Sequence, residues 1–358
     1  MIKQWLMAMI LMLGLVLTAC GSAEDSQTDS ETNGEEDQQD QETEQVDSEE
    51  GRSISGEVQF YTSQPDADAE QLVSTFNELH PDVQVTIFRS GTEEVISKIL
   101  AEQQAGDIQA DVLLVADAVT FESLKEQELL LAYESDEFAH IPDEFIDSDH
   151  MYAGTKVMAT VLAVNTNDVA ELPTSWHAVN EDDANGEVIM PSPLYSGAAA
   201  YNVGVFSRQG DFGWEFFENL SGQDVTVVQG NGAVLQAVAG GEQAYGMVVD
   251  FIVARAKAEG SPIELIYPEE GVPVITEPIG IMNGTDNEEA SKAFVDFVLS
   301  EQGQQMAADI GYTPIREGIM APEGLKTIDE MDVLTSDVAD LLSTREEDKQ
   351  RFVDIFGE

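Results

Sequence analysis

Three short turns of the chain place serine or threonine beside glycine where a strand pattern gives way to a helix pattern. They comprise Ser63, Ser90, Gly91, Thr92, Ser196, Gly197 and Ala198. Backbone N–H groups in the first turn of a helix have no acceptor inside that helix, and the helix dipole adds partial positive charge there. Such a turn can bind an anion, although a serine in this place can also serve only as a helix cap, worth about 1 kcal/mol. Turns of this kind that converge would form an anion-binding site.

Three more polar residues stand where they could extend this site. Asn231 follows an expected strand over 225–228 and opens a helix together with Gly232. Asp250 ends an apolar strand over 245–249, where its carboxylate could balance a ligand amine or simply face solvent. Arg89 precedes the second turn and could supply a cation or lie on the surface. The predicted site thus joins backbone amides to a few polar and charged side chains.

Residues for catalysis or metal binding follow no recognisable pattern. The histidines form no His-Glu-x-x-His sequence and stand apart, at His80, His140, His150 and His177. The sequence contains neither a Gly-x-Ser-x-Gly nucleophile pattern nor a phosphate loop of the Walker type, and it has a single cysteine. We therefore expect no enzyme, no catalytic residue, no cofactor and no metal site. A secreted hydrolase is the alternative from another class, and an adhesion lipoprotein is a third.

The elements that would position these turns alternate between strand and helix. In the first part, apolar spacing predicts strand, helix, strand, helix and strand over 58–62, 72–79, 83–87, 92–106 and 111–115. Ser90 and Glu93 there match the Ser-x-x-Glu form of a capping box. The second part repeats this order, with strands predicted over 188–190, 225–228 and 245–249, extended chain over 274–282, and helices around 293–298 and within 331–358. The pattern predicts the α/β class, with sheets covered by helices.

The first twenty residues indicate export. Lys3 precedes an apolar stretch over 5–17, which is too short for a comfortable membrane span. The stretch closes with Leu17, Thr18, Ala19 and Cys20, an order that resembles the lipobox of bacterial lipoproteins. We expect 1–19 to be a signal peptide and Cys20 to carry the lipid, which would hold the protein at the extracytoplasmic face of the cell membrane.

The composition is strongly acidic. The chain has 70 acidic and 15 basic residues, and its formal net charge is −55. The segment 20–55 is almost free of apolar residues, so we expect it to be a disordered tether that follows the lipidated cysteine. The remaining residues are also acidic and offer no basic stripe, which excludes nucleic acid as a partner. Such a surface is typical of a protein that works in high salt or at alkaline pH.

Several motifs occur in an order that is specific when taken together. They are Tyr61–Ser63, Phe76–Val85, Ser90–Thr92, Pro193–Gly197, Gly240–Gly246 and Ala293–Gln304. In this order the chain resembles the solute-binding proteins of ABC importers, in the branch that binds ferric iron, thiamine or 2-aminoethylphosphonate. The resemblance spans about residues 56–320, and it implies a two-lobed type II periplasmic-binding-protein fold with the ligand held in a cleft between the lobes.

This resemblance, combined with the element order, leads to a division of the chain. We expect lobe 1 over 56–160 and 276–330, lobe 2 over 161–275, and a C-terminal helical segment over 331–358. Two extended strands should form the hinge, with crossings near 161–164 and near 272–278. The implied partners are a small-molecule ligand and a membrane permease, and we expect a monomer that closes on its ligand.

The ligand class is narrowed by what the motifs lack. Iron-binding relatives carry two adjacent tyrosines where this chain has Phe251 and Ile252, and no Tyr-Tyr pair occurs in the sequence. Other tyrosines could replace them, namely Tyr195, Tyr201 and Tyr245. Thiamine would want aromatic faces around its cation, for which Trp176, Trp214 and Tyr245 are available. We favour a phosphonate or other organophosphorus anion, with iron or thiamine as the alternative.

Overall fold

The computed structural model describes residues 54–357 of the chain. The predicted signal peptide, Cys20 and nearly all of the predicted tether lie outside the described residues, so lipidation stays a prediction. No helix of the described part is long and apolar enough to cross a membrane.

The first sheet is mixed, with a parallel part and an antiparallel part. Its order is β2 (Val83–Arg89), β1 (Gly56–Thr62), β3 (Val112–Leu114), β12 (Pro278–Met282) and β4 (Leu130–Leu131), and β5 (Ala153–Gly154) also pairs with β12. Strand β1 is parallel to β2 and to β3, whereas β12 runs antiparallel to β3. Strand β12, which follows β11 of the second sheet in sequence, therefore joins a sheet that strands β1, β2 and β3 begin.

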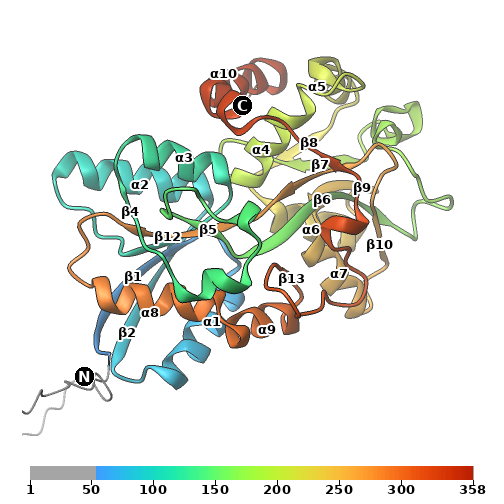
Figure 1. Cartoon of the computed structure of the whole chain (residues 1–358). Helices are drawn as coiled ribbons and strands as arrows, with labels where there is room; N and C mark the ends of the chain where they lie inside the picture. The colour runs from blue at the N-terminus through green and yellow to red at the C-terminus, as the bar shows by residue number, and fades with distance from the viewer. Residues whose placement is uncertain (1–53, 358) are drawn as a thin grey trace, which may run out of the picture. The chain divides into compact units, whose positions relative to one another are not determined.

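Helices cover both faces of this sheet. Helices α1 (Asp66–Leu79) and α8 (Glu288–Leu299) lie on one face, and α2 (Thr92–Ala105) and α3 (Ala118–Glu126) lie on the other (Figure 1). The strand residues alternate accordingly, because successive side chains of a strand point to opposite faces. Val58 and Phe60 pack in the core with α1 and α8, whereas Tyr61 packs in the core with α2 and α3.

The second sheet is built around one long buried strand. Its order is β14 (Val333–Leu334), β11 (Val272–Ile275), β6 (Lys156–Asn165), β9 (Tyr245–Val249), β7 (Val188–Pro191) and β8 (Thr226–Val228), and both β10 (Ile263–Ile266) and β13 (Thr313–Pro314) pair with β6. All ten residues of β6 are buried. Such a strand reads as a continuous apolar run because both of its faces are covered.

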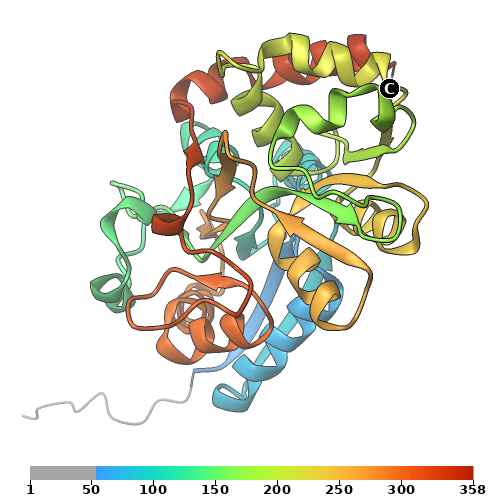
Figure 2. The ribbon, with the colours of Figure 1, turned by 90° about the vertical axis from the view of Figure 1, so that its right-hand side faces the viewer.

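The second sheet also has helices on two sides. Helices α4 (Gly197–Phe206) and α5 (Gly213–Gly222) lie above it in Figure 1, and α6 (Asn231–Gly240) and α7 (Asp250–Ala258) lie below it. Figure 2 shows the same layers from the side. The remaining elements are α9 (Glu301–Asp309), α10 (Val338–Phe356) and the short 3₁₀ turns η1 (Asp136–His140), η2 (Asp143–Phe145), η3 (Trp176–Asn180), η4 (Asp182–Ala184) and η5 (Ile328–Glu330). Below, lobe 1 denotes the first sheet with its helices, and lobe 2 the second.

The chain passes between the two sheets three times: the first two passages run along neighbouring strands, and the third leads from β12 and α8 of lobe 1 to β13 and β14 of the second sheet. It leaves the first sheet after Gly154 and returns to it at Pro278. The first two passages are joined where the amide of Thr155 donates to the carbonyl of Thr276, at 3.0 Å. The expected crossing over 161–164 lies instead inside β6, because those residues pair with β9 of the second sheet. The lobe limits proposed from the sequence stay a proposal.

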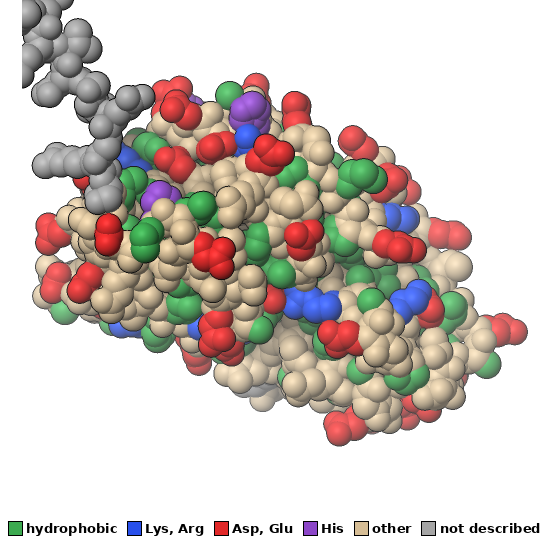
Figure 3. All heavy atoms as spheres, turned by 90° about the horizontal axis from the view of Figure 1, so that it is seen from below, with side chains coloured by type: hydrophobic (Ala, Val, Ile, Leu, Met, Phe, Trp, Pro, Cys, Tyr) green, Lys and Arg blue, Asp and Glu red, His purple; other side chains and the backbone are tan. Residues whose placement is uncertain are grey.

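The exposed surface carries the acidity of the sequence. Figure 3 shows acidic side chains spread over the whole of the face drawn, with basic side chains few and separate. No groove lined by charges of one sign is visible on this face. On this face the acidic side chains are therefore distributed rather than gathered at one place.

Candidate functional site

A cavity of about 600 Å³ lies between the lobes. Its lining comes from the starts of helices in both lobes and includes seven residues predicted from the sequence: Ser63, Gly91, Thr92, Ser196, Gly197, Ala198 and Asn231. Ser90 and Asp250 do not line it. Most of the predicted turns therefore meet at one cavity, although they come from positions more than a hundred residues apart.

Helix α2 presents its first turn without a side-chain cap. Its N-cap is Gly91, and no side chain accepts from the first amides. The predicted capping box is wrong, because the Ser90 hydroxyl bonds the carboxylate of Glu94 instead of the backbone. Of the first-turn amides, that of Glu93 donates to the carbonyl of Tyr195 in lobe 2, at 3.3 Å. The lobes thus touch directly at the start of α2.

Helix α4 begins at the cavity with a serine cap. Ser196 Oγ accepts from the amide of Ala199 at 3.3 Å, which confirms its structural role as an N-cap. The same oxygen accepts from Asn231 Nδ2 at 3.3 Å, and Asn231 Oδ1 accepts from the amide of Val249. The side chain of Asn231 therefore ties the starts of α4 and α6 together.

Lining amides without an acceptor in the described part of the chain stand in the first turns of α2, α4 and α6. Those of Thr92, Gly197 and Gly232 are among them, one at each helix start. Helix α6 resembles α2 in having a glycine N-cap, Gly230, and no side-chain cap. Unpaired amides at three helix starts, with the positive ends of the helix dipoles behind them, can together stabilise an anionic group.

Tyr195 lies between two glycine caps. A β-carbon on Gly91 would come within 2.6 Å of its ring, and one on Gly230 within 3.3 Å. Similarly, a β-carbon on Gly197 would come within 2.5 Å of the carbonyl oxygen of Ala116 in lobe 1. Gly91 and Gly197 permit an approach of the two lobes that any side chain would obstruct, whereas Gly230 packs on Tyr195 within lobe 2. Gly91 and Gly197 were predicted as site residues for their amides, and not for this packing role.

Of the charged lining residues, Arg255 and Glu277 form ion pairs within the described part of the protein, whereas Asp66, Glu259 and Arg89 do not. Arg255 binds the carboxylate of Asp68 through both terminal nitrogens, at 3.0 and 3.2 Å. Glu277 pairs with Lys156 at 2.5 Å, and both side chains are at least nine-tenths buried. Arg89 donates from Nε to the carbonyl of Gln64 and forms no ion pair with any described residue. Its charge is therefore free to meet a ligand anion.

Tyr312 forms part of the cavity wall, which sequence reasoning missed. It is buried, and its hydroxyl donates to Asp68 Oδ2 at 2.6 Å. Burial, reinforced by the nearby carboxylates of Glu277 and Asp68, raises the pKa of the Tyr312 phenol well above its usual value. This tyrosine therefore stays a neutral phenol. It lies beside the hinge because β13 follows it directly and pairs with β6.

Asp250 is held inside lobe 2 rather than at the cavity. Its carboxylate accepts from the hydroxyl of Tyr267 at 3.0 Å and from the amide of Phe251 at 2.8 Å. Burial raises the pKa of Asp250 to about 7, against the opposing effect of these hydrogen bonds. The carboxylate is only 1% exposed, so it does not face a ligand in this arrangement.

The residues considered for iron or thiamine only partly line the cavity. Phe251 and Ile252 line the cavity, as do Tyr195 and Tyr312, whereas Tyr201 and Tyr245 do not. Trp176 is fully buried in the core of lobe 2, and its indole N–H donates to the carbonyl of Gly271. Within residues 54–357, no group of three or more His, Cys, Asp and Glu side chains could hold a metal ion.

Comparison with known proteins gives a match over most of the chain. The sequence family described as bacterial extracellular solute-binding protein matches residues 71–331. The chain belongs to this family. Its members bind solutes outside the cytoplasm and, at the level of the family, are not enzymes.

Individual relatives of this binding protein are distant. It is 24% identical over 243 residues to a probable ABC transporter periplasmic-binding protein of Sinorhizobium fredii, covering 65% of this chain and 67% of the relative. Its fold is similar to that of AfuA from Actinobacillus pleuropneumoniae, whose structure contains fructose-6-phosphate, with a TM-score of 0.78 and 23% identity over 84% of this chain and 98% of that one.

Two further solved structures share the fold. Iron-bound HitA from Pseudomonas aeruginosa matches with a TM-score of 0.72 and 23% identity, over 83% of this chain and 99% of that one. A periplasmic thiamin-binding protein matches with a TM-score of 0.73 and 15% identity, over 86% and 98%. These likenesses establish the type II periplasmic-binding-protein fold that the sequence predicted, and they leave the ligand open because the three proteins bind different solutes.

Proposed function

We propose that this binding protein is the substrate-binding lipoprotein of an ABC importer and that it captures a small organophosphorus anion. The observation that carries the proposal is the meeting of three unpaired helix-start amides, those of Thr92, Gly197 and Gly232, at one cavity. A tetrahedral phosphonate or phosphate ester offers three oxygens, and each can accept from a different amide.

Arg89 supports an anionic ligand. Its guanidinium lines the same cavity without a carboxylate partner among the described residues, so it can pair with a phosphoryl oxygen. The cavity volume of about 600 Å³ leaves room for more than a bare phosphate ion. The organic substituent of a phosphonate or phosphate ester would extend toward α7. A phosphonate or a sugar phosphate fits this description better than an inorganic ion does.

The other ligand classes have less support. Fe(III) is bound best by phenolates, and the raised pKa of Tyr312 keeps that side chain protonated. A thiazolium or pyrimidine ring would want aromatic faces, and the tryptophans considered for that purpose do not line the cavity. We therefore rank ferric iron and thiamine below an organophosphorus ligand.

The remaining parts of the proposal concern the setting. We propose that Cys20 carries a diacylglycerol, which keeps a monomeric protein at the outer face of the membrane near its permease. Closure of the lobes over the ligand would create the surface that the permease recognises, since only the closed state brings both lobes together.

The test is calorimetric titration of the full chain with 2-aminoethylphosphonate, fructose-6-phosphate, inorganic phosphate, Fe(III)-citrate and thiamine. We expect one of the organophosphorus compounds to bind most tightly. Ser196→Asp should abolish that binding, because it adds a negative charge at the start of α4. Ser196→Asn is the matched control, since asparagine has the same shape and caps a helix equally well without the charge. Tightest binding of Fe(III)-citrate or thiamine would contradict the proposal.

A further inference from the structure

The C-terminal helix α10 is attached to lobe 2. Phe352 packs against Phe217 of α5, with ring centroids 6.3 Å apart. Leu341 lies over Gly204 of α4, where a β-carbon on the glycine would come within 2.7 Å of the leucine side chain. Arg208, which follows the C-cap of α4, pairs with Asp348 at 2.8 Å. These contacts fix α10 to the helices of lobe 2.

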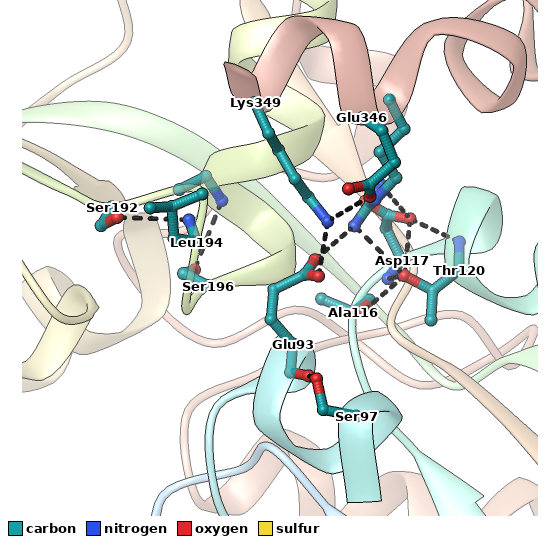
Figure 4. Close-up of polar contacts among 12 residues, drawn as sticks. Glu93, Ser97, Ala116, Asp117, Thr120, Ser192, Leu194, Ser196, Glu346 and Lys349 are labelled. Atoms are coloured by element: carbon teal, nitrogen blue, oxygen red, sulfur yellow. Dashed lines mark hydrogen bonds and ion pairs between the residues drawn. The ribbon is translucent and has the colours of Figure 1, made fainter. Parts of the chain in front are cut away.

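Two basic side chains of α10 reach across to lobe 1. Arg345 binds the carboxylate of Asp117 at 3.0 Å and that of Glu93 at 3.1 Å, and Lys349 binds Glu93 at 2.6 Å. Figure 4 shows Lys349 pointing from its helix toward Glu93, with Asp117 and Thr120 beside them. Both basic side chains are only 12% exposed, and Asp117 is 1% exposed. The four charges form a nearly buried network between the lobes.

The acidic partners lie at the starts of two lobe 1 helices. Glu93 follows Thr92 directly in the first turn of α2, so it is adjacent to a lining amide of the cavity. Asp117 caps α3 by accepting from the amide of Thr120 at 2.9 Å. The ion pairs of these carboxylates therefore connect α10 to a helix start that forms part of the candidate site.

We propose that Arg345 and Lys349 are positioning residues that clasp lobe 1 against lobe 2 through Glu93 and Asp117 and thereby set how long the protein stays closed. This inference does not depend on the identity of the ligand. The clasp acts from outside the cavity, through the first turn of α2, and neither basic residue lines the cavity.

The direction of the effect follows from desolvation. In the closed protein the carboxylate of Asp117 is buried, and the guanidinium of Arg345 compensates its charge. Without that guanidinium the closed state holds an uncompensated buried charge, which is strongly unfavourable. Opening the lobes returns the carboxylate to water and removes this cost. Loss of Arg345 should therefore shift the equilibrium toward the open state rather than simply weaken the fold.

The chain contains a matched control on the same helix. Arg351 pairs with Glu218 of α5 at 3.4 Å, and both side chains are about half exposed. Both partners belong to the lobe 2 assembly, so this ion pair does not cross the cleft. Arg345→Gln and Arg351→Gln make the same chemical change on α10, and only the first removes an inter-lobe contact.

The experiment measures the distance between the lobes in the ligand-free full chain. Spin labels are placed at Glu70→Cys in α1 and Thr226→Cys in β8, both exposed, in a Cys20→Ser background. Pulsed electron spin resonance then gives the distribution of inter-lobe distances. We expect Arg345→Gln to raise the ratio of open to closed molecules by about tenfold or more, as for loss of a buried ionic partner. Arg351→Gln should match the parent protein.

Two further variants serve as controls, one for rescue by a retained charge and one for a failure of Arg345→Gln to fold. Arg345→Lys keeps a positive charge at the clasp and should restore part of the closed population, which a role in packing alone would not predict. If Arg345→Gln does not fold, Lys349→Gln carries the test, and it should raise the open population while Arg345 remains in place. Equal distance distributions for the clasp variant and Arg351→Gln would overturn the proposal.

Discussion

The ring of Tyr195 in lobe 2 lies so close to Gly91 in lobe 1 that a β-carbon on the glycine would come within 2.6 Å of it. The same tyrosine accepts through its carbonyl from the amide of Glu93. The start of α2 is thus packed and hydrogen bonded across the cleft at one residue. Closure therefore depends on the absence of a side chain at Gly91.

Gly91→Ala should disfavour the closed state. Overpacking of this kind costs about 1–3 kcal/mol, and opening the lobes relieves it. We expect a larger radius of gyration by small-angle X-ray scattering of the ligand-free protein. Gly232→Ala is the control, because Gly232 lines the same cavity and a β-carbon there meets nothing within 4 Å. An unchanged radius for Gly91→Ala would show that this contact does not limit closure.

Glu277→Gln should destabilise the hinge. The substitution leaves Lys156 buried without its partner, which typically costs about 3–5 kcal/mol. Urea denaturation measures the loss. The double variant Lys156→Met, Glu277→Leu should recover much of it, since apolar replacement of a buried ion pair is often neutral. Equal stability of the single and double variants would contradict an uncompensated charge as the cause.

Asp250 should make stability fall as pH rises from about 4 to about 7. Its pKa is raised to about 7 in the folded protein, so between its unfolded and folded pKa values the folded state binds the extra proton. The contribution has a slope of at most about 1.4 kcal/mol per pH unit. The stability difference between the parent and Asp250→Asn, measured by urea denaturation across this range, should shrink or reverse with increasing pH. A stability difference between the two proteins that stays constant with pH would refute the raised pKa of Asp250.

Phe294→Ala should be among the costly core substitutions. Phe294 is fully buried and packs on Phe60 and Phe76, with centroids 4.9 and 5.0 Å away. Loss of such a ring costs about 3–5 kcal/mol, seen as a lower denaturation midpoint. Leu79→Ala, at a residue 49% exposed, should change the midpoint little.

The sequence predicted the strand and helix order because each lobe buries alternating or continuous apolar runs that are visible locally. The details that it missed depend on distant partners. Ser90 matched a capping box, but its hydroxyl donates to the carboxylate of the nearby Glu94 instead. Asp250 was predicted to balance a ligand amine or to face solvent, and Tyr267 instead binds it within the lobe. The roles of Tyr312 and Arg345 arise from contacts over two hundred residues apart, for which one sequence gives no signal.

The seven lining residues that the sequence predicted were predictable for a different reason. Each lies between a strand and the next helix or at the start of that helix, and helix starts gather at the carboxyl ends of strands. That rule places the turns without any knowledge of side-chain contacts. The lipid anchor at Cys20 stays a prediction from sequence.

The central claim is that unpaired amides at three helix starts hold a phosphoryl group. Amide-resolved NMR of the full chain during titration with 2-aminoethylphosphonate or fructose-6-phosphate tests it most directly. For the compound that binds, we expect the amide protons of Thr92, Gly197 and Gly232 to move downfield together, as protons do when they begin to donate to a charged oxygen. Binding that leaves all three resonances in place would contradict the account.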